Sequence, residues 1–147
     1  MADADHTPRV LVDDRQDGPV DVEGLVSLAR RVLVGEGVPG SELSVSLVSE
    51  AEIAGLHQRY MGEAGPTDVL SFPLGDEDGA EDGVRILGDV VIAPSVAAAN
   101  NPADPAGELR LLLVHGILHL LGHDHVEDGA KAAMWVRQER YTGVRVP

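Results

Sequence analysis

The feature that most restricts the fold of this chain is a histidine-rich apolar stretch at residues 111–125, which reads LLLVHGILHLLGHDH. It contains four of the chain's six histidines. Its leucine-rich start predicts a buried helix, and Gly122 stands where a helix often ends in a left-handed turn. His115 and His119 are four residues apart, so a helix places both side chains on one face.

A third histidine follows the predicted end of this helix. Because the chain turns back after Gly122, His125 can come close to His115 and His119. A single histidine on an apolar face is usually a hydrogen-bonded core residue, but three at this spacing favour a metal site. Three neutral imidazoles with an open fourth position are typical of catalytic rather than structural zinc. We therefore predict one Zn²⁺ per chain, bound by these three histidines.

Two further polar residues lie between the glycine and the third histidine. His123 is expected to point away from the metal, at the surface or towards substrate, with competition for the metal as the alternative. Asp124 is the carboxylate nearest to the histidines in sequence. It either orients a ligand imidazole or accepts a proton, or it only caps a turn, and we keep it as a candidate catalytic residue.

The histidine spacing H-x3-H-x5-H, with a glycine before the third histidine, also occurs in metzincin proteases. Those enzymes carry a glutamate directly after the first histidine as the general base for hydrolysis. Here that position is Gly116, which neither takes nor gives a proton. The metal site therefore resembles that of a protease, but the peptidase machinery is absent, and proteolysis is the less favoured alternative.

The charge balance restricts the partners of the chain. Eleven basic and 25 acidic residues give a net charge of −14, and ten of the basic residues are arginines. Such acidity repels nucleic acid at long range, so any RNA-binding surface has to be local and built from arginine. The chain has no cysteine, which excludes thiolate ligands. With neither a signal peptide nor an apolar run of roughly 18 residues, we expect a soluble cytoplasmic protein.

Strand and helix patterns alternate along the chain, and we expect a single domain over residues 1–147. Ser49 caps a helix with Glu52 completing a capping box, and this helix points Ile53, Leu56 and Tyr60 inward. The stretch 127–141 is interpreted as a C-terminal helix, in which Ala130, Ala133, Met134, Val136 and Arg137 stand at mixed spacing. We predict strands at 9–12, 43–48, 69–72 and 87–92, and helices at 20–34, from 49, at 94–99, from 106 and at 127–141.

Three motifs stand out in the chain: HGILHLLGHDH, PTDVLSFP at residues 66–73 and LGDVVI at residues 87–92. Together they resemble the bacterial YbeY family of rRNA maturation factors. The resemblance implies a zinc-dependent single-strand endoribonuclease that acts with the ribosomal small subunit and its associated factors. Its role would be 3′-end maturation of small-subunit (16S) rRNA and ribosome quality control. It also implies an α/β (α+β) fold with a small mixed four-stranded sheet, one antiparallel edge and about five helices.

The family's metal ligands fall on the three histidines that the spacing selects, but one position departs from the family pattern. The family usually carries Tyr-Arg before the loop, whereas this chain reads Arg59-Tyr60-Met61. We therefore take Arg59 as the candidate phosphate-binding catalytic residue. Two alternatives to the nuclease stay open: a ribosome-assembly factor with a mainly structural zinc, and a metal hydrolase of another substrate.

Overall fold

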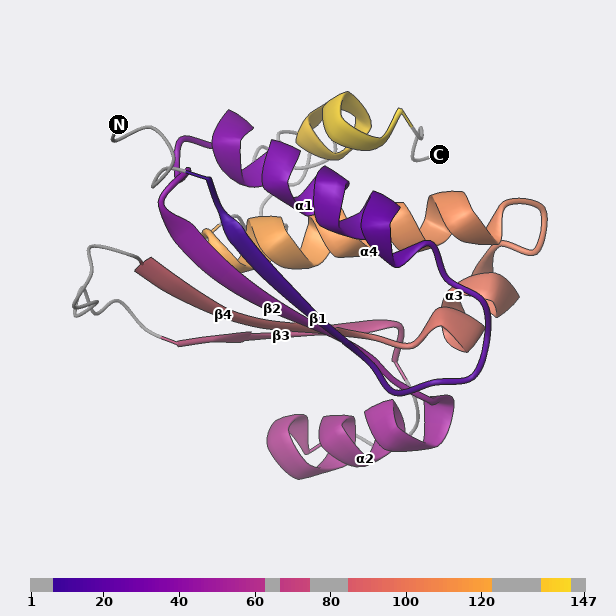
Figure 1. Cartoon of the computed structure of the whole chain (residues 1–147). Coiled ribbons are helices and arrows are strands. Elements are labelled where there is room, and N and C mark those ends of the chain that lie inside the picture. Colours follow the sequence, from indigo (N-terminus) through magenta and orange to yellow (C-terminus); the bar gives the residue numbers. More distant parts are fainter. Residues whose placement is uncertain (1–6, 63–66, 75–84, 123–135, 144–147) are drawn as a thin grey trace.

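The computed structural model describes residues 7–62, 67–74, 85–122 and 136–143, which form one sheet with helices on both faces (Figure 1). The strands are β1 (Arg9–Asp14), β2 (Ser41–Leu47), β3 (Val69–Pro73) and β4 (Arg85–Ile92). The helices are α1 (Val22–Gly35), α2 (Glu50–Met61), α3 (Pro94–Asn100) and α4 (Pro105–Leu120), and residues 136–142 form a further helical segment. Within these ranges no helix is long and apolar enough to cross a membrane.

The strand order in the sheet is β1-β2-β4-β3. β1, β2 and β4 are parallel, and β3 pairs antiparallel with β4 at one edge. Parallel neighbours need a crossover connection, which α1 provides between β1 and β2, whereas β3 and β4 follow one another directly. The mixed four-stranded sheet with an antiparallel edge and the five helices of the described chain confirm the predicted fold class.

The sheet has a core on each face. α1 and α4 cover the upper face in Figure 1, and α2 covers the lower face. β2 buries every second residue, Leu43, Val45 and Leu47, in the larger core under α1 and α4. α4 is buried on several sides, because nine of its sixteen residues are buried. The smaller core beside α2 consists of Val48, Ile53, Leu70, Val91 and Ala93.

The start of α2 follows the sequence-based expectation only in part. Ser49 Oγ accepts a hydrogen bond from the Glu52 backbone at 3.1 Å, as an N-cap does. The Glu52 carboxylate pairs with Arg15 at 3.0 Å instead of returning to the cap. Tyr60, predicted to point inward, is 60% exposed. That prediction was wrong, because Tyr60 lies on the same side of α2 as the buried Ile53 but near the end of the helix, where that side is exposed.

α4 approaches the sheet closely at Gly116. A Cβ atom at this position would lie 2.7 Å from Val90 Cγ1 and 3.3 Å from Ser71 Oγ. The Ser71 hydroxyl also donates a hydrogen bond to the Gly116 carbonyl at 3.1 Å. Gly116 therefore lets α4 lie against β3 and β4. The glycine at this position is required for packing, in addition to lacking the carboxylate that a protease carries there.

Replacing Gly116 by alanine is expected to destabilise the protein although alanine is the better helix former. Overpacking against Val90 costs about 1–3 kcal/mol, which exceeds or cancels the gain in helix propensity of up to about 1 kcal/mol. Gly55 in α2 is the matched control, because its Cβ would meet no atom of the described residues within 4 Å. Gly55→Ala should gain about 0.5–1 kcal/mol. Urea unfolding measures both changes, and an equal gain at the two positions would refute the close approach.

Candidate active site

The two histidines of α4 lie side by side. His115 and His119 occupy the last two turns of the helix, and their ring centroids are 4.7 Å apart at an interplanar angle of 62°. Both side chains are half-buried, whereas the residues between them are buried. The expectation that one helix face carries both rings is confirmed. Two imidazoles this close on one rigid helix suit two ligands of a single metal ion.

The turn after α4 begins as the sequence predicts. Gly122 has φ +97°, in the left-handed region, and its backbone N–H donates to the His119 carbonyl at 3.0 Å. His123, Asp124 and His125 lie outside the described residues, so His125 as third ligand stays a prediction. Within the described ranges no three His, Cys, Asp or Glu side chains are grouped to hold a metal ion.

A buried glutamine from the C-terminal helix contacts the first histidine. His115 Nδ1 and Gln138 Oε1 are 2.7 Å apart, and Gln138 is only 3% exposed. Sequence reasoning missed this residue, because it predicted the C-terminal helix without assigning the face that is buried; Val136 in this helix is 58% exposed. The buried positions of this segment are Gln138 and, three residues on, Tyr141. The spacing of three residues between Gln138 and Tyr141 places both on one helix face, and this was the signal in the sequence that could have identified Gln138.

The segment 136–142 is fastened to the end of α1 by polar contacts. Arg137 Nη1 lies 2.9 Å from both carboxylate oxygens of Glu36, and the Tyr141 hydroxyl donates to the same carboxylate at 2.7 Å. Arg31 donates to the Tyr141 carbonyl. Burial raises the pKa of Tyr141, and the hydrogen bond to Glu36 raises it further. The phenol therefore stays a neutral donor over the physiological pH range. These contacts hold the helical segment that carries Gln138 in place.

Residues 67–73 of the PTDVLSFP motif lie beside α4. Its Ser71 contacts Gly116, as described above, and its Asp68 accepts a hydrogen bond from Asn100 Nδ2 at 3.2 Å. Burial raises the pKa of Glu108 in the first turns of α4, and the negative charge of Asp68 raises it further. The motif thus joins β3 to α3 and α4 and brings two carboxylates near each other.

Glu108→Gln is expected to stabilise the protein near neutral pH. A folded-state pKa raised above 4.5 means that the fold favours the neutral acid. The protonated Glu108 side chain contributes to the stability of the fold below pH 4.5, and this contribution is lost as the pH rises through the folded-state pKa of Glu108. The neutral amide does not suffer this loss, so the variant should gain in melting temperature over wild type at about pH 7 and much less at about pH 4. A lower melting temperature for Glu108→Gln than for wild type at about pH 7 would contradict the inference that the fold favours the neutral form of Glu108.

Arg59 lies at the end of α2, on the opposite face of the sheet from α4. Its Cζ is 5.8 Å from the ring centroid of Tyr60, and that ring packs edge-on against Phe72 of β3 at 5.5 Å. Arg59 makes no ion pair or hydrogen bond with the part of the chain that the structure describes. The edge strand β3 lies between Arg59 and the histidines of α4, because Ser71 contacts α4 while its neighbour Phe72 contacts α2. The structure does not bring Arg59 into contact with His115 or His119.

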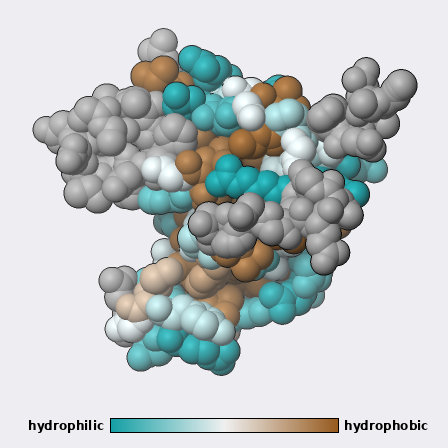
Figure 2. Space-filling model, turned by 90° about the vertical axis from the view of Figure 1, so that its left-hand side faces the viewer, coloured by the Kyte–Doolittle hydropathy of each residue, from teal (hydrophilic) through white to brown (hydrophobic). Residues whose placement is uncertain are grey.

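The ends of α2 and α4 nevertheless point to the same side of the molecule, the left in Figure 1. Figure 2 shows that side, where the surface is indented between the α2 lobe below and the body above, with apolar residues in the indentation. Tyr60 and Met61 at the end of α2 are 60% and 47% exposed, and Leu74 after β3 is 59% exposed. An aromatic and apolar surface therefore lies beside Arg59 at this side.

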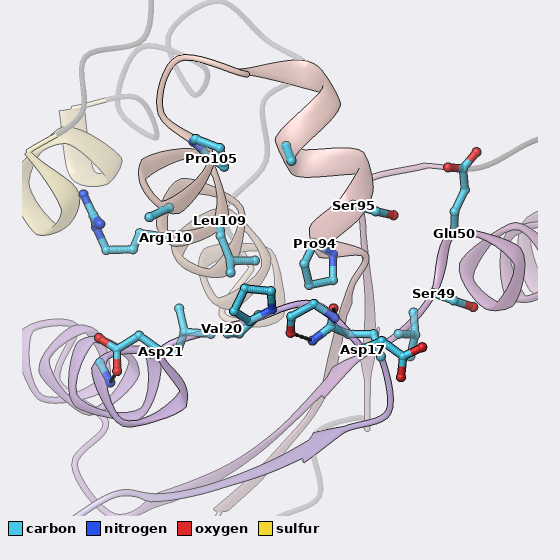
Figure 3. A pocket seen from close by; sticks show the side chains of 18 residues that line it. Asp17, Val20, Asp21, Ser49, Glu50, Pro94, Ser95, Pro105, Leu109 and Arg110 are labelled. Carbon is cyan, nitrogen blue, oxygen red and sulfur yellow. Dashed lines mark hydrogen bonds between the residues drawn. The ribbon is translucent and has the colours of Figure 1, made fainter.

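A pocket of about 750 Å³ lies at the opposite end of α4 (Figure 3). It opens at the carboxyl ends of the three parallel strands, where ligands of open α/β sheets often bind. Val20, Pro94 and Leu109 line its hollow, with Glu50 and Arg110 at opposite sides. The pocket is lined by the first two turns of α4, and the histidines stand in the last two. None of the described residues that line it is a histidine, whereas His115 and His119 stand near the other end of this helix.

Comparison with known proteins gives a consistent result. Residues 12–143 match the family model described as "Endoribonuclease YbeY". A Cutibacterium acnes protein named endoribonuclease YbeY is 46% identical over 80% of this chain and 81% of its own length. A Frankia alni protein of that name is 48% identical over 82% and 73%, respectively. The solution structure of TM1509 from Thermotoga maritima is similar with a TM-score of 0.63 and 31% identity, over 92% of this chain and 87% of that one.

Proposed function

The chain belongs to the endoribonuclease YbeY family, and from this premise we propose that it is a zinc-dependent endoribonuclease for single-stranded RNA. The family confirms the predicted enzyme class, a hydrolase acting on RNA. The observation that carries the proposal is the pair His115 and His119, whose rings lie 4.7 Å apart on one face of α4. His125 completes the proposed ligand set, with one Zn²⁺ per chain.

The described residues fit such a metal. The two imidazoles project from a helix whose neighbouring residues are buried, and the Nδ1 atom of His115 already has a partner in Gln138. When bound, a metal of this kind supplies Lewis-acid chemistry at a phosphoryl group and activates water. The chain's own part is then to hold the imidazoles neutral and fixed. We assign Asp124 to orienting a ligand imidazole or accepting a proton.

Features at the α2 end support single-stranded RNA as the substrate. Single strands bind where exposed aromatic rings stack with bases beside cationic side chains. Tyr60 is 60% exposed, and the Arg59 guanidinium lies next to its ring. With a net charge of −14, the chain depends on such a local cation for phosphate contact. Arg59 is therefore our candidate for neutralising phosphate charge in place of the arginine that Met61 replaces.

The proposed cellular role follows the family resemblance. The substrate would be the 3′ region of the small-subunit 16S rRNA, with additional action in ribosome quality control. The partners would be the ribosomal small subunit and its associated factors, and the location would be the cytoplasm. We take the whole chain, residues 1–147, as one endoribonuclease domain.

One experiment tests the proposal. Zinc content and cleavage are measured on the same purified sample, with a single-stranded RNA and its duplex as substrates. We expect about one zinc per chain and cleavage of the single strand only. Zinc without cleavage, or with cleavage that the His119→Ala variant retains, would favour an assembly factor with a structural zinc. A preparation that neither binds zinc nor cleaves RNA would refute the proposal.

A further inference from the structure

The contact between Gln138 and His115 joins the proposed metal site to the C-terminal helical segment. We propose that Gln138 is a positioning residue that fixes the tautomer and ring orientation of His115, so that the Nε2 atom is the one offered to the metal. This inference rests on the proposed function, because it assigns a role towards the same metal. It concerns a residue 23 positions after the histidine, on a separate helix.

The chemistry of the hydrogen bond determines the tautomer. The Gln138 atom facing Nδ1 at 2.7 Å is the amide oxygen, which only accepts hydrogen bonds. Nδ1 of His115 must therefore carry the proton. A neutral imidazole has a single N–H, so its Nε2 keeps the lone pair that a metal needs. The glutamine thus holds the ring in the ligating form before any metal is bound.

Burial makes this contact stronger than a surface hydrogen bond. Gln138 is 3% exposed, so water competes little for its amide oxygen. A buried amide that lacks a partner is costly, whereas leucine or methionine would fill the same space without that cost. The polar side chain at this position is therefore explained by the histidine that it faces.

The support of Gln138 is fixed as well. Its neighbour Arg137 is bound to Glu36, and Tyr141, one turn later, donates to the same carboxylate. These contacts tie the segment to the end of α1. A partner that orients a ligand from outside the coordination sphere typically changes metal affinity by about 10–100-fold when it is removed.

Two substitutions separate orientation from packing. Gln138→Met keeps the approximate volume but has no acceptor oxygen, and Gln138→Glu keeps an acceptor. Zinc affinity is measured by competition with a chromophoric chelator. We expect Gln138→Met to bind zinc about 10–100-fold more weakly than wild type, and Gln138→Glu to bind it at least as tightly as wild type.

A second measurement does not depend on metal or on activity. The ¹⁵N shifts of the histidine rings in the zinc-free protein report which nitrogen carries the proton. We expect His115 to be protonated at Nδ1 in wild type and to become a mixture of tautomers in Gln138→Met. His119 is the internal control, because its ring nitrogens should be unchanged between the two proteins.

The outcomes distinguish this inference from the proposed function. If wild type binds zinc and Gln138→Met binds it equally tightly, the positioning role is refuted while the nuclease proposal stands. A wild-type His115 protonated at Nε2 would also refute it, even if the variants fail to fold. If wild type binds no zinc, the proposed function fails, and the wild-type tautomer alone decides whether Gln138 holds the ring as inferred.

Discussion

Replacing His119 by alanine should lower zinc content far below one per chain and abolish RNA cleavage. Four-ligand structural zinc sites bind with about 10–16 kcal/mol, so one ligand contributes about 3 kcal/mol, or a roughly 100-fold loss of affinity. Cleavage should fall further, because the Lewis acid lost from the site supplies several kcal/mol of transition-state stabilisation, about 10²–10⁴-fold in rate. Zinc analysis and a gel assay with single-stranded RNA measure the two effects.

His57→Ala is the matched control, because His57 lies in α2 on the other face of the sheet. This variant should keep its full zinc content. A fold check by circular dichroism then separates loss of a ligand from loss of structure. If His119→Ala still contains one zinc per chain, the ligand assignment is wrong, whatever the variant does to RNA.

The parts of the site that local sequence determines were predictable. The spacing of His115 and His119 follows from the period of a helix, and the turn at Gly122 follows from the conformations that only glycine adopts easily. Alternation of apolar residues identified β2, and two neighbouring apolar runs gave the antiparallel pair β3 and β4. In each case, the information lies within a few residues of the feature.

The parts that tertiary contacts determine were not predictable in the same way. Gln138 reaches His115 across 23 residues, and no local pattern of the C-terminal helix specifies that partner. The same holds for Gly116, since its lack of a side chain could be interpreted chemically, but its contact with Val90 could not be foreseen. Tyr60 was misplaced because helical spacing gives the face of a side chain but not where the underlying sheet ends.

Glu36→Ala should cause a large loss of stability. The Glu36 side chain is 5% exposed and accepts from both Arg137 and Tyr141. Removing one partner of a buried ion pair costs about 3–5 kcal/mol. Arg137 is 36% exposed and water can solvate it in part, so we expect a loss of about 2–4 kcal/mol in urea unfolding. Glu42→Ala is the control, because the Arg9–Glu42 pair is 3.9 Å apart with Arg9 61% exposed, and it should lose at most about 1 kcal/mol.

The same substitution tests whether the α1 contacts support the metal site. Loosening the segment 136–142 removes the fixed support of Gln138, so Glu36→Ala should weaken zinc binding in the direction of Gln138→Met. In the double variant the two effects on zinc affinity should not add, because both act through the same hydrogen bond to His115. Additive losses would mean that Glu36 acts on the metal site by another route. A Glu36→Ala protein as stable as wild type would show that the contacts of Glu36 with Arg137 and Tyr141 do not hold the segment 136–142 in place.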